Sequence, residues 1–131
     1  MQPEGLRVWT KLASEAGQFA DATTREPNEL ERQLVVGQFC ATIDTVGNTS
    51  NPVVMNASVG WSIPVYQQYD VDETFRRPVT LRLHSTPDGA WVNSANGERW
   101  TDEEVVATLV NTLREWVATN GRFRETDDDL Y

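Results

Sequence analysis

The sequence predicts an α+β fold, a two-layer sandwich in which two helices cover one face of a four-stranded antiparallel sheet. Residues 53–66 alternate between apolar and small or polar side chains, the pattern of a strand with one buried face. Helical periodicity occurs near the N-terminus and again after a capping box formed by Thr101 and Glu104. The predicted order is therefore helix, four strands in two hairpins, helix.

The first predicted element is an N-terminal helix over residues 2–22. Pro3 stands in the first turn, where proline is tolerated. Apolar side chains then recur every three or four positions and define one face: Leu6, Trp9, Leu12, Ala13, Ala16, Phe19 and Ala20. Gly5 and Gly17 each cost about 1 kcal/mol relative to alanine in a helix, so we expect this helix to depend on docking against the sheet.

The first predicted hairpin joins a strand over residues 35–44 to the long strand over residues 53–66. Residues 23–28 are interpreted as a break, and residues 30–34 fit a helical turn and a strand equally well. Residues 45–52 are rich in Gly, Asn and Ser, which is typical of a turn.

This hairpin is nearly free of charge. Asp44 is the only charged residue between positions 36 and 69, although 24% of the chain is charged. Its outward side chains would be Thr42, Asn56, Ser58 and Ser62. Because the centres of protein interfaces are depleted of charge, this surface is either covered by a partner or another copy, or is a neutral surface without a partner.

The second predicted hairpin pairs residues 78–85 with residues 90–95. Its first strand directs Val79, Leu81 and Leu83 inward and Thr80, Arg82 and His84 outward. The Thr-Pro-Asp-Gly sequence at 86–89 predicts the turn, and Asn96-Gly97 predicts another.

The last predicted element is a C-terminal helix that packs on the same sheet face as the first. It begins at the capping box and ends near Gly121, a good C-terminal cap. Its apolar stripe comprises Val105, Val106, Leu109, Leu113, Trp116 and Val117. Residues 1–124 are predicted to form a single domain, and the acidic residues 125–131 to form a disordered tail.

Composition excludes several classes of function. The net charge of −9 argues against binding to the phosphates of nucleic acid. No signal peptide and no membrane-spanning apolar run is apparent, and the single cysteine implies no disulfide, so we expect a cytoplasmic protein. One cysteine and one histidine cannot supply the usual zinc ligands, and no Gly-rich phosphate loop occurs. We therefore expect no metal and no cofactor.

Two groups of reactive side chains have simpler interpretations than catalysis or metal binding. Residues 67–77 form a polar connection whose acids lack the spacing of a calcium loop, so this segment is interpreted as a solvated acidic loop. The alternation of side chains along the strands allows Cys40, Asp44 and His84 to lie on the same sheet face, where they could act as nucleophile, orienting group and base. A lone cysteine and a lone histidine are better explained as ordinary surface or interface residues, and we do not expect an enzyme.

The leading functional hypothesis is a non-enzymatic protein-binding module, an adaptor, chaperone or inhibitor, that binds a protein partner or self-associates. Trp91, if it faces outward, would be an aromatic anchor of the kind that dominates interfaces. The candidate binding residues are Asn56, Ser58, Ser62, Tyr66, His84 and Trp91. The first alternative is a small-molecule-binding domain or minor enzyme, with a pocket lined by Trp61, Trp116 and Tyr66. The second is a structural subunit of a larger assembly.

Overall fold

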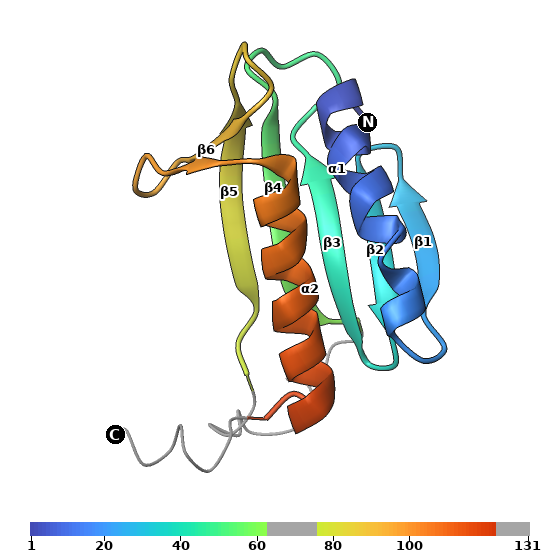
Figure 1. Cartoon of the computed structure of the whole chain (residues 1–131). Helices are drawn as coiled ribbons and strands as arrows, with labels where there is room; N and C mark the ends of the chain where they lie inside the picture. Colours follow the sequence, from blue (N-terminus) through green and yellow to red (C-terminus); the bar gives the residue numbers. More distant parts are fainter. Residues whose placement is uncertain (63–75, 123–131) are drawn as a thin grey trace.

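The computed structural model describes residues 1–62 and 76–122 and has two layers, a sheet and a pair of helices (Figure 1). The sheet has 7 strands that lie side by side in chain order. Every neighbouring pair is antiparallel. The α+β class, the terminal helices and the antiparallel sheet are therefore confirmed, whereas the predicted number of four strands is wrong.

The helices and strands have the following bounds. Helix α1 spans Pro3–Ala13 and is followed by the 3-10 turn η1, Ala16–Gln18. The strands are β1 Thr23–Asn28, β2 Glu31–Val36, β3 Phe39–Thr45, β4 Val54–Trp61, β5 Val79–Ser85, β6 Trp91–Asn93 and β7 Arg99–Trp100. Helix α2 spans Asp102–Thr119.

The strand predicted over residues 35–44 is in fact the end of β2, a tight turn and β3. Gly37 has a φ of 60°, and Val36 pairs with Phe39 across the turn. Glycine at the first central position is typical of two-residue hairpin turns. The turn also shifts the alternation of inward and outward side chains by one residue, so that Val36 rather than Val35 faces the core.

Residues 23–28, which were predicted to be a break, form the edge strand β1. All 6 residues are exposed, so no apolar alternation marks the strand in the sequence. Its register with β2 shifts between Arg25 and Asn28, and Pro27 lies in this irregular part. An edge or a bulge is where a sheet accommodates proline.

Helix α1 is shorter than the predicted helix over residues 2–22. It ends at Ala13, and Gly17 falls in η1, where glycine costs less than in the middle of an α-helix. Ala16 and Phe19 still pack against the core. The apolar periodicity therefore identified part of the buried face, although the backbone that carries its end is not α-helical. Leu6, which was assigned to this face, is 38% exposed, and the fully buried Val8 was not assigned to it.

Both helices pack on one face of the sheet, as predicted (Figure 1). Strand β4 shows the expected alternation: Met55, Ala57 and Val59 are at most 1% exposed, and the residues between them are partly exposed. Neighbouring strands and both helices complete the core with Leu34, Ala41, Ile43, Leu83, Val8, Leu12, Val105, Leu109, Leu113 and Trp116. The end of the predicted strand over residues 63–66, most of the 67–77 connection and the acidic tail lie outside the described residues.

The second predicted hairpin is confirmed as β5 and β6, with a third short strand that was not predicted. Leu83 is fully buried, but Val79, which was expected to face inward, is 44% exposed near the beginning of β5. After the turn at Asn96 and Gly97 the chain pairs again with β6 as β7. A strand of 2 residues is too short to show any periodicity.

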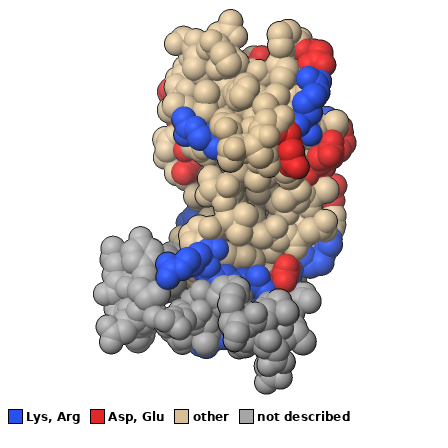
Figure 2. All heavy atoms as spheres, turned by 90° about the vertical axis from the view of Figure 1, so that its left-hand side faces the viewer, with Lys and Arg blue, Asp and Glu red and all other residues tan. Residues whose placement is uncertain are grey.

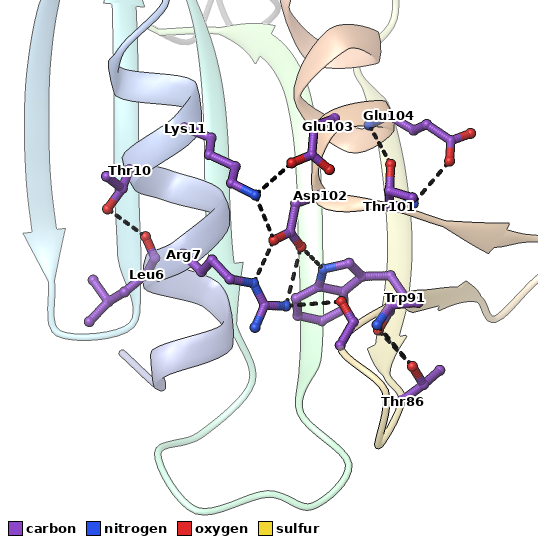
Figure 3. A network of polar contacts seen from close by, with 12 residues as sticks. Leu6, Arg7, Thr10, Lys11, Thr86, Trp91, Thr101, Asp102, Glu103 and Glu104 are labelled. Atoms are coloured by element: carbon purple, nitrogen blue, oxygen red, sulfur yellow. Dashed lines mark hydrogen bonds and ion pairs between the residues drawn. The ribbon is translucent and has the colours of Figure 1, made fainter.

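The capping box at the start of α2 is confirmed (Figure 3). The Thr101 hydroxyl accepts a hydrogen bond from the Glu104 amide at 3.1 Å, and the Glu104 carboxylate accepts one from the Thr101 amide at 3.1 Å.

Thr101→Ala is expected to lower the free energy of unfolding by about 1 kcal/mol, because it removes the side-chain acceptor at the N-cap. Urea denaturation measures this change. The matched control is Thr10→Ala in α1, whose hydroxyl bonds back to the Leu6 carbonyl and caps nothing. Equal losses in the two variants would contradict the capping role of Thr101.

Candidate functional site

The sheet face opposite the helices, here called the open face, has no helix or strand of the described chain over it (Figure 1). Side chains alternate along each strand, so the open face carries those that point away from the buried set. Its described members are Thr23, Arg25, Glu31, Gln33, Val35, Cys40, Thr42, Asp44, Val54, Asn56, Ser58, Thr80, Arg82, His84 and Val92.

A row of uncharged polar side chains crosses the middle of the open face. Gln33 is opposite Thr42, Thr42 is opposite Ser58, and Ser58 is opposite Thr80. Directly opposed side chains in a sheet lie about 5 Å apart, so these four form one continuous strip, here called the central row.

Charged side chains lie around the central row, at the margins of the open face. The next row contains Asp44, Asn56 and Arg82, and Arg25 and Glu31 lie toward the β1 edge. Burial raises the pKa of the Asp44 carboxyl, since a charged group there is partly removed from water. The sequence prediction of an uncharged face therefore describes the centre of the face and not its periphery.

One polar atom of the central row lacks a partner among the described residues. The side-chain oxygen of Gln33 is buried and accepts no hydrogen bond from them. Beside it lies a shallow, open hollow of about 630 Å³ lined by Arg25, Glu26, Pro27, Glu31 and Gln33. Buried acceptors in folded proteins are nearly always satisfied, so this oxygen is a group that a bound partner could pair.

The register separates the side chains considered as a nucleophile and its base. Cys40 is opposite Gly60 on β4, whereas His84 is opposite Val54, so about 20 Å of strand lies between the two positions. Burial raises the pKa of the Cys40 thiol, which keeps it protonated and a poor nucleophile. The His84 ring lies 3.4 Å from the Ser94 hydroxyl. Among residues 1–62 and 76–122, no cluster of His, Cys, Asp or Glu is arranged to hold a metal.

The predicted binding residues fall into different places. Ser58 lies in the central row of the open face, Asn56 lies in the next row between Asp44 and Arg82, and His84 lies toward one end of the face. Ser62 follows β4 and bonds to the β2–β3 turn, its amide donating to the Gln38 carbonyl at 2.6 Å. Tyr66 lies outside the described residues.

Trp91 does not lie on the open face. It is fully buried on the helix side of the sheet, and its indole N–H donates to the Asp102 carboxylate at 2.8 Å (Figure 3). The proposal of an outward aromatic anchor at this position is therefore wrong. Strand β6 has 3 residues, too few for the alternation of apolar and polar side chains to show which face Trp91 occupies. The buried indole N–H needs an acceptor, and Asp102 at the start of α2 supplies it.

Asp102 is the centre of a polar network that sequence reasoning missed. Its carboxylate accepts hydrogen bonds from the Arg7 guanidinium at 2.5 and 3.2 Å and from the Lys11 ammonium at 3.2 Å, besides the one from Trp91 (Figure 3). Burial raises the pKa of this carboxyl, but the bonds from Arg7, Trp91 and Lys11 outweigh burial and lower it. The network joins α1, α2 and β6. Its signal in the sequence is the spacing of two cations one helical turn apart on the first helix.

Three aromatic rings form a packed cluster near the end of α2. The ring centroids of Phe39 and Trp61 are 5.0 Å apart, and each lies 5.8 Å from that of Trp116, all with edge-to-face geometry. Trp61 and Trp116 were candidates for lining a ligand pocket with Tyr66. The two rings instead contact each other, and their inward orientation is confirmed.

Comparison of the chain with protein-family models, curated proteins and solved structures finds no match. Neither helix in the described part of the chain is long and apolar enough to cross a membrane.

Proposed function

We propose that this chain is a non-enzymatic protein-binding module whose partner docks on the open face. The observation that supports this most is the central row, in which Gln33, Thr42, Ser58 and Thr80 give an uncovered sheet an uncharged polar centre. Interface centres are depleted of charge and their rims are polar and charged, which is the distribution on this face.

The shape of the face favours a protein over a small molecule. Small-molecule sites are concave and bury most of their ligand, whereas the hollow beside Gln33 is shallow and open. The net charge of −9 likewise disfavours nucleic acid. A second copy of the chain is one partner that such a face can receive.

Ser58→Arg tests this proposal. The substitution places an unpaired charge at the centre of the contact, where desolvation without a partner weakens binding by about tenfold or more. Affinity for a partner captured from the native host, purified and remeasured by titration calorimetry, is expected to fall accordingly. Light scattering applies the same comparison to self-association.

The matched control is Ser14→Arg, which adds the same side chain at an exposed position just past α1 in the helix layer. Binding by this variant is expected to equal that of the unaltered chain, and both variants should melt at the same temperature. A chain that is strictly monomeric and captures no protein would contradict the proposal, as would equal binding by the two variants.

A further inference from the structure

Strand β5 has an unpaired edge along its first half. It pairs with β4 from Val79 to His84, but β6 pairs with it only at Leu83, His84 and Ser85. Within the described chain, residues 79–82 therefore have no strand on the side away from β4. Figure 2 views the molecule from this side and shows an uncharged surface across the middle, with Lys and Arg side chains along its lower border.

The backbone of this edge is oriented to accept another strand. The Arg82 carbonyl accepts a hydrogen bond from the Ser94 amide at 2.9 Å, so it points away from β4. In an antiparallel sheet, residues two apart direct their N–H and C=O to the same side. The N–H and C=O of Thr80 therefore also point outward, where the described residues provide no strand to bond them.

The β1 edge of the sheet and the unpaired part of β5 differ in protection. Natural sheets guard an edge with charges, proline and irregular register. Strand β1 has all three, in Arg25, Glu26, Pro27 and the register shift. By contrast, Val79, Thr80 and Leu81 are uncharged β-formers, and Val79 is 44% exposed.

We propose that an extended, acidic segment of a partner protein adds to the sheet as an antiparallel strand beside residues 79–82. This rests on the protein-binding function proposed above and specifies the form of its partner, because the side chains of Thr80 and Arg82 belong to the open face. Addition of a strand supplies main-chain hydrogen bonds, and flanking side chains supply the specificity.

The charges beside the edge select an acidic partner. Arg77 and Arg82 are exposed, and neither forms an ion pair within the described residues. Two copies pairing through this edge around Thr80 would place Arg82 of each copy opposite Pro78 of the other and next to its Arg77. Like charges would then lie close together at both ends of the pairing, which disfavours self-association here. Asp or Glu in the added strand would instead pair with these guanidinium groups.

The test measures binding of two short fluorescent peptides to the full chain by anisotropy. Both alternate valine and threonine; one has aspartate at each end and the other lysine. The aspartate peptide is expected to bind at least about tenfold tighter, to weaken as salt is raised, and to slow hydrogen exchange of the Thr80 amide.

Thr80→Pro removes the outward N–H and is expected to abolish binding, whereas Thr80→Ala keeps the N–H and is expected to keep the preference for the aspartate peptide. If the proline variant does not fold, the double variant Arg77→Glu and Arg82→Glu tests the inference instead. This variant should bind the lysine peptide more tightly than the aspartate peptide. Equal affinity for both peptides, no binding at millimolar peptide, or unchanged binding by a folded Thr80→Pro variant would overturn the inference. If the peptide test fails but a captured partner still binds more weakly to the Ser58→Arg variant, the strand addition is wrong and the proposed protein-binding function stands.

Discussion

Asp102→Asn is expected to lower the free energy of unfolding by about 2–4 kcal/mol. The Asp102 side chain is 6% exposed, and it accepts hydrogen bonds from Arg7, Lys11 and Trp91. Asparagine offers a single acceptor oxygen, and its amide group would direct hydrogens at donors. Chemical denaturation at neutral pH measures the loss.

The pH dependence of this loss has a definite sign. The pKa of Asp102 is lowered in the folded chain, so its contribution is complete above the ordinary carboxyl pKa of about 3.9 and is lost as the pH falls through the lowered folded value. The difference in stability between the unaltered chain and the asparagine variant should therefore shrink in acid. A difference that grows below pH 4 would contradict the assignment of an ionised Asp102.

Glu103→Gln is the matched control for Asp102→Asn. Glu103 is the next residue of α2 and also bonds to Lys11, at 2.7 Å, but its side chain is 71% exposed. Exposed ion pairs contribute about 0–1 kcal/mol, so this variant should lose much less stability. Equal losses would show that burial at Asp102 is unimportant.

Gly121→Ala is expected to cost about 2–4 kcal/mol. Gly121 has a φ of 72°, which side chains other than glycine seldom adopt. A β-carbon there would lie 2.5 Å from the Trp61 ring and 2.8 Å from the Phe39 ring, so the aromatic cluster would have to move. Thermal denaturation monitored by tryptophan fluorescence follows both the stability and the cluster.

Gly89→Ala separates the two causes of this cost. Gly89 has a φ of 84°, but no atom lies within 4 Å of the position that its β-carbon would occupy. The free energy of unfolding of this variant should fall by about 1 kcal/mol, the contribution of backbone strain alone. If both variants lost the same stability, contact with Trp61 and Phe39 would not constrain the end of α2.

Long amphipathic patterns were predictable from the sequence, and short or exposed strands were not. The alternation along β4 and the stripe and capping box of α2 identified their buried faces, because many positions agree with one period. Strand β1 is fully exposed and β7 has 2 residues, so neither has an apolar pattern. The turn at Gly37 was hidden because the residues on both sides of it are apolar and continue a plausible strand.

The sequence indicated which way some side chains of the open face point, but not which residues are their neighbours. The outward directions of Asn56 and Ser58 followed from the alternation along one long strand. Gln33 joins the row of Ser58 through residues 30–34, for which the sequence did not distinguish a strand from a helical turn. The sequence did not settle which way Trp91 faces, because its hydrogen-bond partner Asp102 comes near it only where β6 and α2 meet. The unpaired edge of β5 depends on the length of β6, which only the sheet pairing reveals.

Cysteine labelling tests most directly the claim that a protein partner covers the open face. In a Cys40→Ser background, Ser58→Cys and Ala57→Cys place single thiols on neighbouring positions of β4 that point to opposite faces. The account predicts that the thiol at position 58 reacts roughly tenfold or more faster than the one at position 57 in the free chain, and becomes protected when the captured partner is added. An unchanged labelling rate at position 58 in the complex would contradict it.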